Sequence, residues 1–334
     1  MTTASVLVTV TTSWNVTGEK IDKEGCLVKN VKSYVSEAAK EIRETPANRE
    51  QAVRIMRDWI QQNNDINNVR QDEAFILRFL RHKKYSIPMA QQTMLKYLSL
   101  RKYYPAVFMN LDCEDTKLRD IFDNGYVAVS PVRDSKGRRV IVYNMSKFNA
   151  SKYGCWEMCR AHILIYETLM CDPLDQMCGF THVGDGNGVS TGHITSWNPT
   201  DFARLLKWGE QSLPMRHKEI HLVNIPAAVK YIIDFAVSKV SPKMAERLNI
   251  HCSNKTLHKK IDVGCLPKEF GGKIKFSEMV QYTKKILSDK RQELLELDNM
   301  ELLSTRGITS SRRPTGLKPG EGSVEGSFRK LEID

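Results

Sequence analysis

The sequence predicts an α/β protein in which a small all-helical unit precedes a layered α/β domain. Residues 36–110 carry apolar side chains at helical spacing, most clearly between Phe75 and Leu80. Beyond this unit, short β-rich runs alternate with amphipathic helical segments, which is the pattern of a sheet covered by helices. The 334 residues are enough for both units to have a hydrophobic core.

Two segments make up the N-terminal region. Residues 1–35 are polar and β-branched without an amphipathic period, so we expect them to be disordered. In residues 36–110 the apolar stripe recurs between Met94 and Leu98, and Pro88 fits the first turn of a further helix. We therefore expect three or four helices in this unit.

The α/β domain is expected over residues 111–276. Its first two strands, "GYVAVS" and "RRVIVYNM", are joined by turn-forming residues and predict a hairpin. They are followed by a helix "CWEMCRAHILIYETLM", a strand "MCGFTHVGD", a helix "NPTDFARLLKWGEQS" and a strand "EIHLVNIP". The last strand is apolar almost throughout, which is typical of a strand in the middle of a sheet with both faces covered.

The C-terminal region, residues 277–334, begins as a charged helix. It ends in a stretch rich in Gly, Ser, Pro and charge, which we expect to be disordered. Within the helix, the run from Leu294 to Asp298 has the form of a clathrin-box peptide. Such a run is short and also common on amphipathic helices, so it indicates either a clathrin-binding site or an ordinary helix face.

The charge of the chain favours an anionic partner without identifying it. Fifty Lys and Arg residues against 39 Asp and Glu residues give a net charge of +11, which suits a nucleic acid, a membrane surface or an acidic protein. No apolar run approaches the roughly 20 residues of a membrane-spanning helix, and the N-terminus lacks the features of a secretion signal. We therefore expect a cytoplasmic protein whose eight cysteines are reduced.

Sequence motifs of catalysis and metal binding are not found. The cysteines and histidines lack zinc-site spacing, and neither a Walker lysine motif nor a nucleophile elbow occurs. The stretch "GDGNGVSTG" fits neither a dinucleotide-binding loop nor a calcium-binding loop. We therefore predict no catalytic residue, no metal site and no cofactor.

A nearly apolar helical segment is flanked by basic residues. Only two of the eleven residues from Ala227 to Val237 are charged, and a helix that is apolar nearly all round is either deeply buried or faces lipid. Basic pairs stand on both sides of it: Arg216 with Lys218, and Lys243 with Arg247. Two hypotheses fit equally well, a helix that covers a cavity and docks on an anionic membrane, and a core helix with solvated ends.

Four stretches carry a resemblance to a known family. They are "DEAFILRFLRHKKYSIPMA", "GDGNGVSTGH", "LPMRHKEIHLVNIP" and "LHKKIDVGCLPKEFGGK", of which the last has the most specific pattern, Leu-Pro-x-x-[Phe/Tyr]-Gly-Gly. Together they span roughly residues 40–275 in the expected order. The chain resembles the CRAL-TRIO family, in the branch of alpha-tocopherol transfer protein, cellular retinaldehyde-binding protein and the clavesins.

The resemblance implies a fold and a site. The family has a helical domain followed by an α/β lipid-binding domain, whose sheet floors an apolar pocket closed by a mobile gate helix. On this chain the gate corresponds to residues 224–247. In this branch basic residues beside the gate bind phosphoinositide headgroups, and the matching positions are Arg216, Lys218, Lys243 and Arg247. The matching pocket positions are His162, Tyr166, Phe180, Trp197, Leu205, Trp208, Leu213, Ile232, Ile233 and Phe235.

The pocket positions also have simpler explanations. Each could be an ordinary core side chain. His162 and Tyr166 lie one helical turn apart and could hydrogen-bond a ligand hydroxyl, each other or buried water.

Departures from the family pattern restrict the cargo. Asp185–Gly188 replaces the Asp-Leu-Glu-Gly of many members, so the local turn is expected to differ. Members that carry phosphatidylinositol have a Glu and a Lys where this chain has Arg204 and Val237. A buried phosphate without partners is prohibitively costly, so the resemblance implies a mostly apolar cargo such as a tocopherol, retinoid or carotenoid.

The resemblance therefore implies a non-enzymatic carrier of a small hydrophobic lipid. It would act in the cytoplasm, associate reversibly with the surface of phosphoinositide-containing membranes, and not bind nucleic acid. The alternative hypothesis is a lipid-sensing trafficking adaptor that recruits clathrin through its C-terminal region.

Overall fold

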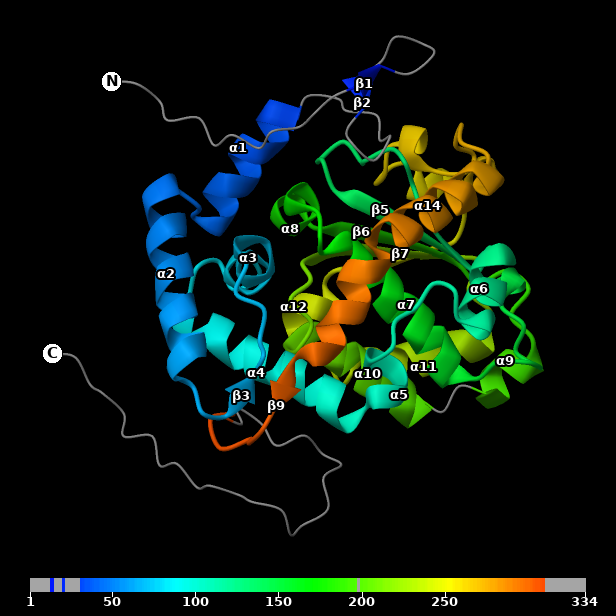
Figure 1. Ribbon diagram of the computed structural model, residues 1–334. Helices are drawn as coiled ribbons and strands as arrows, with labels where there is room; N and C mark the ends of the chain where they lie inside the picture. The colour runs from blue at the N-terminus through cyan, green and yellow to red at the C-terminus, as the bar shows by residue number, and fades with distance from the viewer. Residues whose placement is uncertain (1–12, 15–19, 22–30, 197–198, 310–334) are drawn as a thin grey trace, which may run out of the picture.

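The computed structural model describes residues 13–14, 20–21, 31–196 and 199–309, and it places a five-stranded sheet at the centre of an α/β unit (Figure 1). The strand order is β4-β5-β6-β7-β8. β4 runs antiparallel to β5, and the other neighbouring pairs are parallel, as crossover helices require. The strands are β4 Val127–Val129, β5 Arg139–Asn144, β6 Phe180–Asp185, β7 His217–Val223 and β8 Leu248–His251.

The predicted hairpin is confirmed by the pairing of β4 with β5. The side chain of Asp134 holds its turn, because Oδ1 accepts hydrogen bonds from the backbone N–H groups of Lys136 and Arg138 at 2.9 Å each. Gly137 follows with φ of 75°, and a Cβ there would lie 2.5 Å from Cγ of Tyr34. The glycine therefore permits both the left-handed backbone of the turn and its close packing on Tyr34.

The two faces of the sheet are covered by different segments. On one face, Val129 and Ile141 belong to the hydrophobic core that also holds the buried side of α7 (Cys155–Leu169). On the other face, Val140 packs in a second cluster with residues 257–270. Successive residues of β5 thus enter different cores, as the alternation of side chains along a strand requires.

β7 lies in the middle of the sheet as predicted, between β6 and β8. Its covering is less complete than its apolar sequence predicts. One face carries His221 and Val223, which are buried, whereas Ile220 and Leu222 on the other face are half-buried. Ile220 pairs with His182 of β6, so the two share a face. The expectation that both faces are covered therefore holds fully for only one of them.

Helices complete the α/β unit. α10 packs against α11 and also contacts α7, so these three lie together below the sheet in the view of Figure 1. α14 packs against β4 and α7 at the edge of the sheet. The helices are α6 Thr116–Asp123, α7 Cys155–Leu169, α8 Pro173–Cys178, α9 Thr191–Ser196, α10 Pro199–Gln211, α11 Ala227–Val237, α12 Pro242–Ala245, α13 Asn254–Leu257 and α14 Phe276–Leu295.

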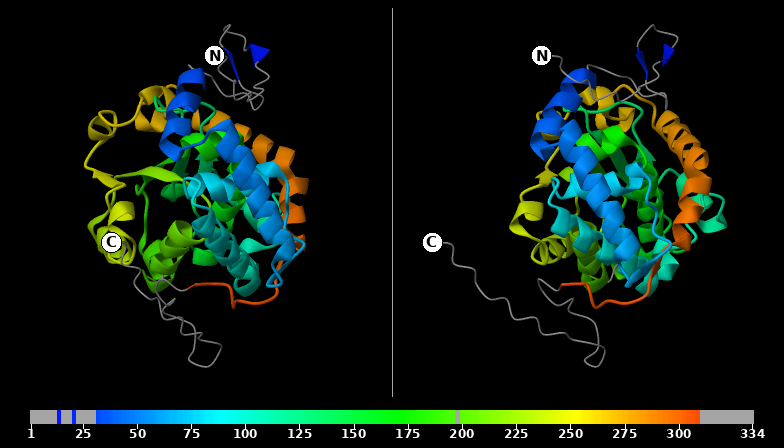
Figure 2. Two further views of the ribbon diagram at one scale, coloured as in Figure 1. Left: turned by 90° about the vertical axis from the view of Figure 1, so that its left-hand side faces the viewer. Right: turned by 60° about the vertical axis from the view of Figure 1, so that its left-hand side comes forward.

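The predicted helical unit is present and lies alongside the sheet (Figure 2). Its first helix begins before the expected boundary at residue 36, and a short pair, β1 (Ser13–Trp14) with β2 (Lys20–Ile21), precedes it. The helices are α1 Val31–Ile42, α2 Pro46–Gln62, α3 Glu73–His82, α4 Ile87–Tyr103 and the short α5 Pro105–Phe108.

The chain returns to the helical unit after α14. β9 (Glu301–Leu302) pairs antiparallel with β3 (Ile66–Asn67), which follows α2. Residues 277–309 therefore tie the α/β unit back to the helices. The expected disorder of the final residues concerns positions 310–334, which lie outside the described part of the chain.

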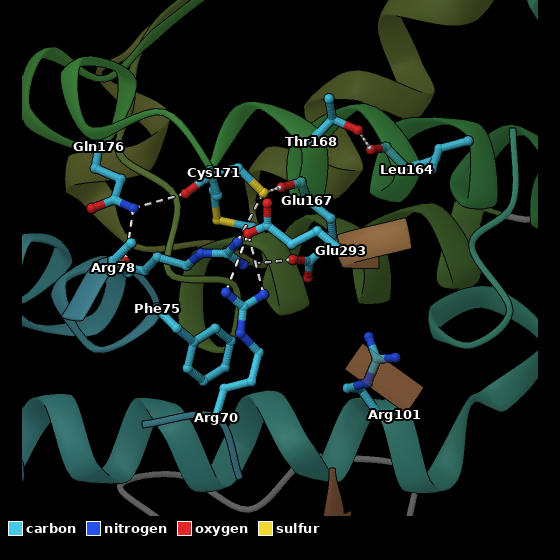
Figure 3. Close-up of polar contacts among 12 residues, drawn as sticks. Arg70, Phe75, Arg78, Arg101, Leu164, Glu167, Thr168, Cys171, Gln176 and Glu293 are labelled. Carbon is cyan, nitrogen blue, oxygen red and sulfur yellow. Dashed lines mark hydrogen bonds and ion pairs between the residues drawn. The ribbon is translucent and has the colours of Figure 1, made fainter. Parts of the chain in front are cut away.

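Ion pairs join the two units, and one of them is fully buried (Figure 3). Nη1 of Arg78, from α3, lies 2.9 Å from Oε2 of Glu167 in α7, and Nη2 lies 3.2 Å from Sγ of Cys171. Arg70 reaches Glu293 of α14 at 3.2 Å. The side chains of Arg78 and Glu167 are only 1% and 0% exposed, so this pair is sealed inside the interface.

Candidate functional site

The nearly apolar segment from Ala227 to Val237 forms α11. One side of this helix is buried and the other is exposed. Val229, Ile232 and Ile233 are buried, while Tyr231 is 75% exposed. The chain enters α11 through Asn224, whose φ of 54° makes a sharp turn after β7. α11 therefore covers one face of the α/β unit and presents its other side to the outside.

Six of the expected pocket residues belong to the main hydrophobic cluster, which is shared by the helical unit and the α/β unit, so their membership also fits ordinary core side chains. Three of them are buried and three are half-buried, and they come from α7, β6, α10, α11 and the loop before β7: Tyr166, Phe180, Leu205, Trp208, Leu213 and Ile233. Ile232 is buried and Phe235 half-buried on α11, but neither belongs to this cluster. Trp197 lies outside the described residues.

Trp208 faces the helical unit. Its ring centroid lies 4.1 Å from that of Tyr104 and 5.9 Å from that of Phe108. Trp208 therefore contributes to the contact between the two units.

A chain of hydrogen bonds between aromatic side chains crosses three neighbouring strands of the sheet. The hydroxyl of Tyr143 on β5 bonds Tyr166 of α7 at 2.9 Å and Nδ1 of His182 on β6 at 2.9 Å. His182 in turn bonds His217 on β7 at 2.8 Å. The chain therefore links α7 to the start of β7 through three neighbouring strands.

His162 makes a separate bond, to the hydroxyl of Tyr126 at 2.7 Å. His162 and Tyr166, whose partners the sequence left open, thus bond two tyrosines and not each other. Sequence reasoning missed Tyr126 and Tyr143, because only the pairing of strands brings them to α7.

Burial keeps the histidines of this region uncharged. Desolvation lowers the pKa of His162 to about 4, and desolvation together with the charge of Arg247 lowers that of His217 to about 4. Desolvation also lowers the pKa of His182 well below its usual value and raises that of Tyr166 to about 12. At neutral pH the region therefore offers neutral hydrogen-bonding groups.

A cleft of about 460 Å³ brings together three of the four expected headgroup-binding residues. It lies where the beginnings of β7 and β8 meet the segment around α12. We call it the basic cleft, and it is lined by Lys136, Lys218, Glu219, His221, Lys243, Glu246, Arg247, Asn249 and Lys260. Lys136 and Lys260 were not predicted as members of this site.

The fourth expected residue, Arg216, is buried beside the cleft. Its side chain is 6% exposed and Nη1 donates a hydrogen bond to the backbone oxygen of Met177. Arg247 is half-buried, and its Nη1 donates to the backbone oxygen of His217. Lys243, by contrast, is exposed. The basic residues thus differ in their access to a ligand.

An acidic residue from the helical unit contacts this group. Oε1 and Oε2 of Glu41, near the end of α1, lie 2.5 and 2.6 Å from Nζ of Lys218, and Oε1 lies 2.9 Å from Nη2 of Arg216. Burial acts to raise the pKa of Glu41, but the bond from Lys218 and the neighbouring cations lower it to about 2. No pattern in the local sequence pointed to this contact between α1 and β7.

A second cleft, of about 520 Å³, lies between the end of α6 and the start of α14. Its lining includes Lys147, Lys268 and Lys275 but none of the expected site residues. Neither of the two clefts is lined by the expected pocket residues.

The clathrin-box run is folded into the protein. Leu294 and Leu297 are both 0% exposed. Oδ2 of Asp298 accepts a hydrogen bond from the backbone N–H of Asn110 at 2.7 Å, and Oδ1 pairs with Arg101. A linear peptide must expose its leucines to be bound, so the folded chain does not present this run to a partner.

Within the described residues, no three His, Cys, Asp or Glu side chains are grouped so that they could hold a metal ion. None of the helices in the described ranges is both long and apolar enough to cross a membrane. Cys155 and Cys159 on α7 are buried and free, with their sulfur atoms 4.0 Å apart.

A helical unit followed by a sheet domain with a helix over one face is the architecture expected of CRAL/TRIO proteins. The chain belongs to this family of lipid-binding and transfer proteins: residues 123–272 match the CRAL/TRIO domain, and residues 45–118 match the Pinta-like UBA domain.

Its relatives include the alpha-tocopherol transfer protein-like proteins. The human one is 30% identical over 239 residues, which cover 71% of this chain and 69% of the relative. The mouse one is 29% identical over 252 residues, covering 75% and 73%. Clavesin-1 of Xenopus laevis is 28% identical over 248 residues, covering 74% and 75%.

Proposed function

We propose that this protein is a non-enzymatic carrier that binds one small hydrophobic lipid under α11 and releases it at phosphoinositide-containing membranes. The observation that carries the proposal is a set of half-buried polar side chains between α7 and the sheet. His162, Tyr143 and Tyr166 keep accessible surface, although each hydrogen-bonds another side chain of the α/β unit. Side chains beside a space in the interior would keep such accessible surface. The half-buried Ile220 and Leu222 on the same sheet face agree with it.

The chemistry of this region favours a mostly apolar cargo with at most one or two polar groups. Arg204, where carriers of phosphatidylinositol have a Glu, is paired with Asp201 at 2.8 Å, and Val237 offers no charge. A phosphate would find no charged partner at Val237, and at Arg204 it would have to compete with Asp201 for the guanidinium. Neutral hydroxyl and imidazole groups instead suit a phenol, alcohol or aldehyde on a hydrocarbon skeleton, as in tocopherols, retinoids or carotenoids.

Mass spectrometry of an organic extract of the purified full-length chain tests the cargo. We expect one class of small hydrophobic lipid, recovered unchanged after incubation with the protein. Recovery of a phosphoinositide from the interior, or conversion of the added lipid to a product, would contradict the proposal.

The basic cleft is the proposed headgroup site, because it connects the sheet to the gate. Lys218 stands on β7, whereas Lys243 and Arg247 belong to the segment after α11. A phosphate bound between them would contact both the fixed sheet and the gate. Headgroup binding could then favour the open state by a shift of population.

Replacing Lys218 and Lys243 together with alanine is expected to weaken binding to vesicles that contain phosphatidylinositol bisphosphate. Each basic residue near an anionic surface contributes about 1 kcal/mol, so the double variant should lose roughly 30-fold in affinity. Cargo affinity should be unchanged. The matched control is Lys147→Ala with Lys275→Ala in the second cleft, which removes the same charge. Equal losses in both double variants would show that only net charge matters.

The vesicle binding is also expected to weaken as the pH rises through about 8. Burial and then the charge of Arg216 lower the pKa of Lys218 to about 8, with Arg138 adding to the effect and Glu41 opposing it. Lys218 therefore loses its proton well below the usual range of lysine, and its attraction for phosphate falls. Co-sedimentation from pH 7 to pH 9 measures this. A Lys218→Arg variant should remove the decline, and an identical decline in that variant would refute the role of Lys218.

A further inference from the structure

We infer that Glu41 regulates the basic cleft by competing with the lipid headgroup for Lys218 and Arg216. In the structure the carboxylate occupies the position of an anionic ligand, and a phosphate must displace it. This inference rests on the proposed headgroup site and adds a regulatory residue from the helical unit.

The contact geometry is that of a bound anion. Both carboxylate oxygens of Glu41 lie within 2.6 Å of Nζ of Lys218, and one of them also lies 2.9 Å from Arg216. Carboxylate and phosphate oxygens use the same charged donors, so one ammonium group cannot serve both fully. The two anions therefore exclude each other at Lys218.

Glu41 lies on the outer side of the two cations. Its side chain is 43% exposed, whereas those of Lys218 and Arg216 are 12% and 6% exposed. The carboxylate is thus the most exposed member of this group, whereas Lys218 also lines the basic cleft, whose lining does not include Glu41. The competition therefore acts on the charge of Lys218.

The rest of the cleft leaves exposed cations ready for first contact. Lys136 is paired with Glu219 at 2.7 Å, and Glu219 also pairs with Arg138. Lys243 and Lys260 both line the cleft and are exposed. A phosphate is therefore expected to meet these exposed lysines first and to reach Lys218 only when Glu41 leaves.

Glu41 has a second partner to which it can turn. Nζ of Lys84, in the turn after α3, lies 3.6 Å from Oε1 of Glu41 and is itself 45% exposed. Ala38 and Ile42, which flank Glu41 on α1, are buried and anchor the helix. Glu41 can therefore give up its contact with Lys218 for one with Lys84 by moving its side chain alone, while α1 stays in place.

The test compares Glu41→Gln with Glu37→Gln in the full-length chain. Glutamine keeps the size of the side chain and removes its charge, and Glu37 lies one turn earlier on the same exposed side of α1. On vesicles of phosphatidylcholine with phosphatidylinositol bisphosphate, we expect Glu41→Gln to bind roughly tenfold tighter, since a charge-assisted competitor is lost. Glu37→Gln should bind as the wild type does. In Lys218→Ala, the further change Glu41→Gln should bring a smaller gain than in the wild type, because only the contact with Arg216 remains to be released.

Other outcomes separate the inference from the proposed function. If the wild type binds these vesicles and Lys218→Ala with Lys243→Ala weakens the binding, but Glu41→Gln has no effect, the competition is refuted and the headgroup site stands. Equal gains in Glu41→Gln and Glu37→Gln would also refute it, because net charge would explain both. If the wild type does not bind the vesicles, the headgroup site itself fails. A gain seen with soluble inositol phosphate but not on vesicles would refute the lipid as the competing ligand.

Discussion

Replacing Arg78 with methionine is expected to lower the free energy of unfolding by about 3–5 kcal/mol, because the variant leaves the carboxylate of Glu167 buried without its cation. The pair is 2.9 Å apart, and both side chains are almost completely shielded from water. The guanidinium of Arg78 also lies 5.2 Å from the ring centroid of Phe75, so its removal loses a second contact. The contacts that are lost lie at the interface between α3 and α7.

A double variant separates the cost of the lone charge from the value of the pair. Arg78→Met with Glu167→Met removes both charges, and we expect it to be less destabilised than Arg78→Met alone. Urea denaturation followed by circular dichroism measures each variant. The control is Arg49→Met, whose partner Glu73 lies 2.6 Å away on the surface, and which should cost about 1 kcal/mol or less. A loss in Arg78→Met no larger than in this control would contradict the argument.

The elements of the fold could be predicted because their signals are local. The apolar stripe of α3 and the turn chemistry at Asp134 each lie within a short window, and both elements are present. Burial was harder to predict. The run "EIHLVNIP", residues 219–226, indicated a strand covered on both faces, but burial depends on what packs against the sheet. One face of β7 is only half-covered, and no feature of the strand itself could indicate this.

The site was predicted in part, for a related reason. The family resemblance placed Lys218, Lys243 and Arg247 together, and they do line one cleft. Glu41 was missed because 177 positions separate it from Lys218, and a lone acid in a charged helix is not a motif. Tyr143 was missed because its bond to His182 depends on the parallel register of β5 and β6. A single sequence does not determine that register.

Replacing Gly272 with alanine should also destabilise the protein severely, by at least about 3 kcal/mol, because the new methyl group would overlap backbone atoms. A Cβ at Gly272 would lie 1.9 Å from the carbonyl oxygen of Leu266 and 2.8 Å from that of Val263. Backbone oxygens cannot turn aside as a side chain can. The backbone N–H of Gly272 also bonds the oxygen of Pro267 at 2.9 Å, so the loop has little freedom to move away. This close approach explains the second glycine of the "LPKEFGGK" stretch.

The effect of Gly272→Ala should reach beyond the loop. Leu266 and Phe270 are buried in the cluster that covers the face of the sheet opposite α7. A shift of the loop would pull these side chains from that core, so we expect lower yield and a lower melting temperature. The control is Gly209→Ala within α10, where the nearest atom to a new Cβ is Nε2 of His217 at 3.9 Å. Alanine there should be tolerated or stabilise by about 0.5–1 kcal/mol, because glycine weakens a helix interior. Similar melting temperatures for the two variants would mean that the loop relaxes freely, and the close approach at Gly272 would then not explain the motif.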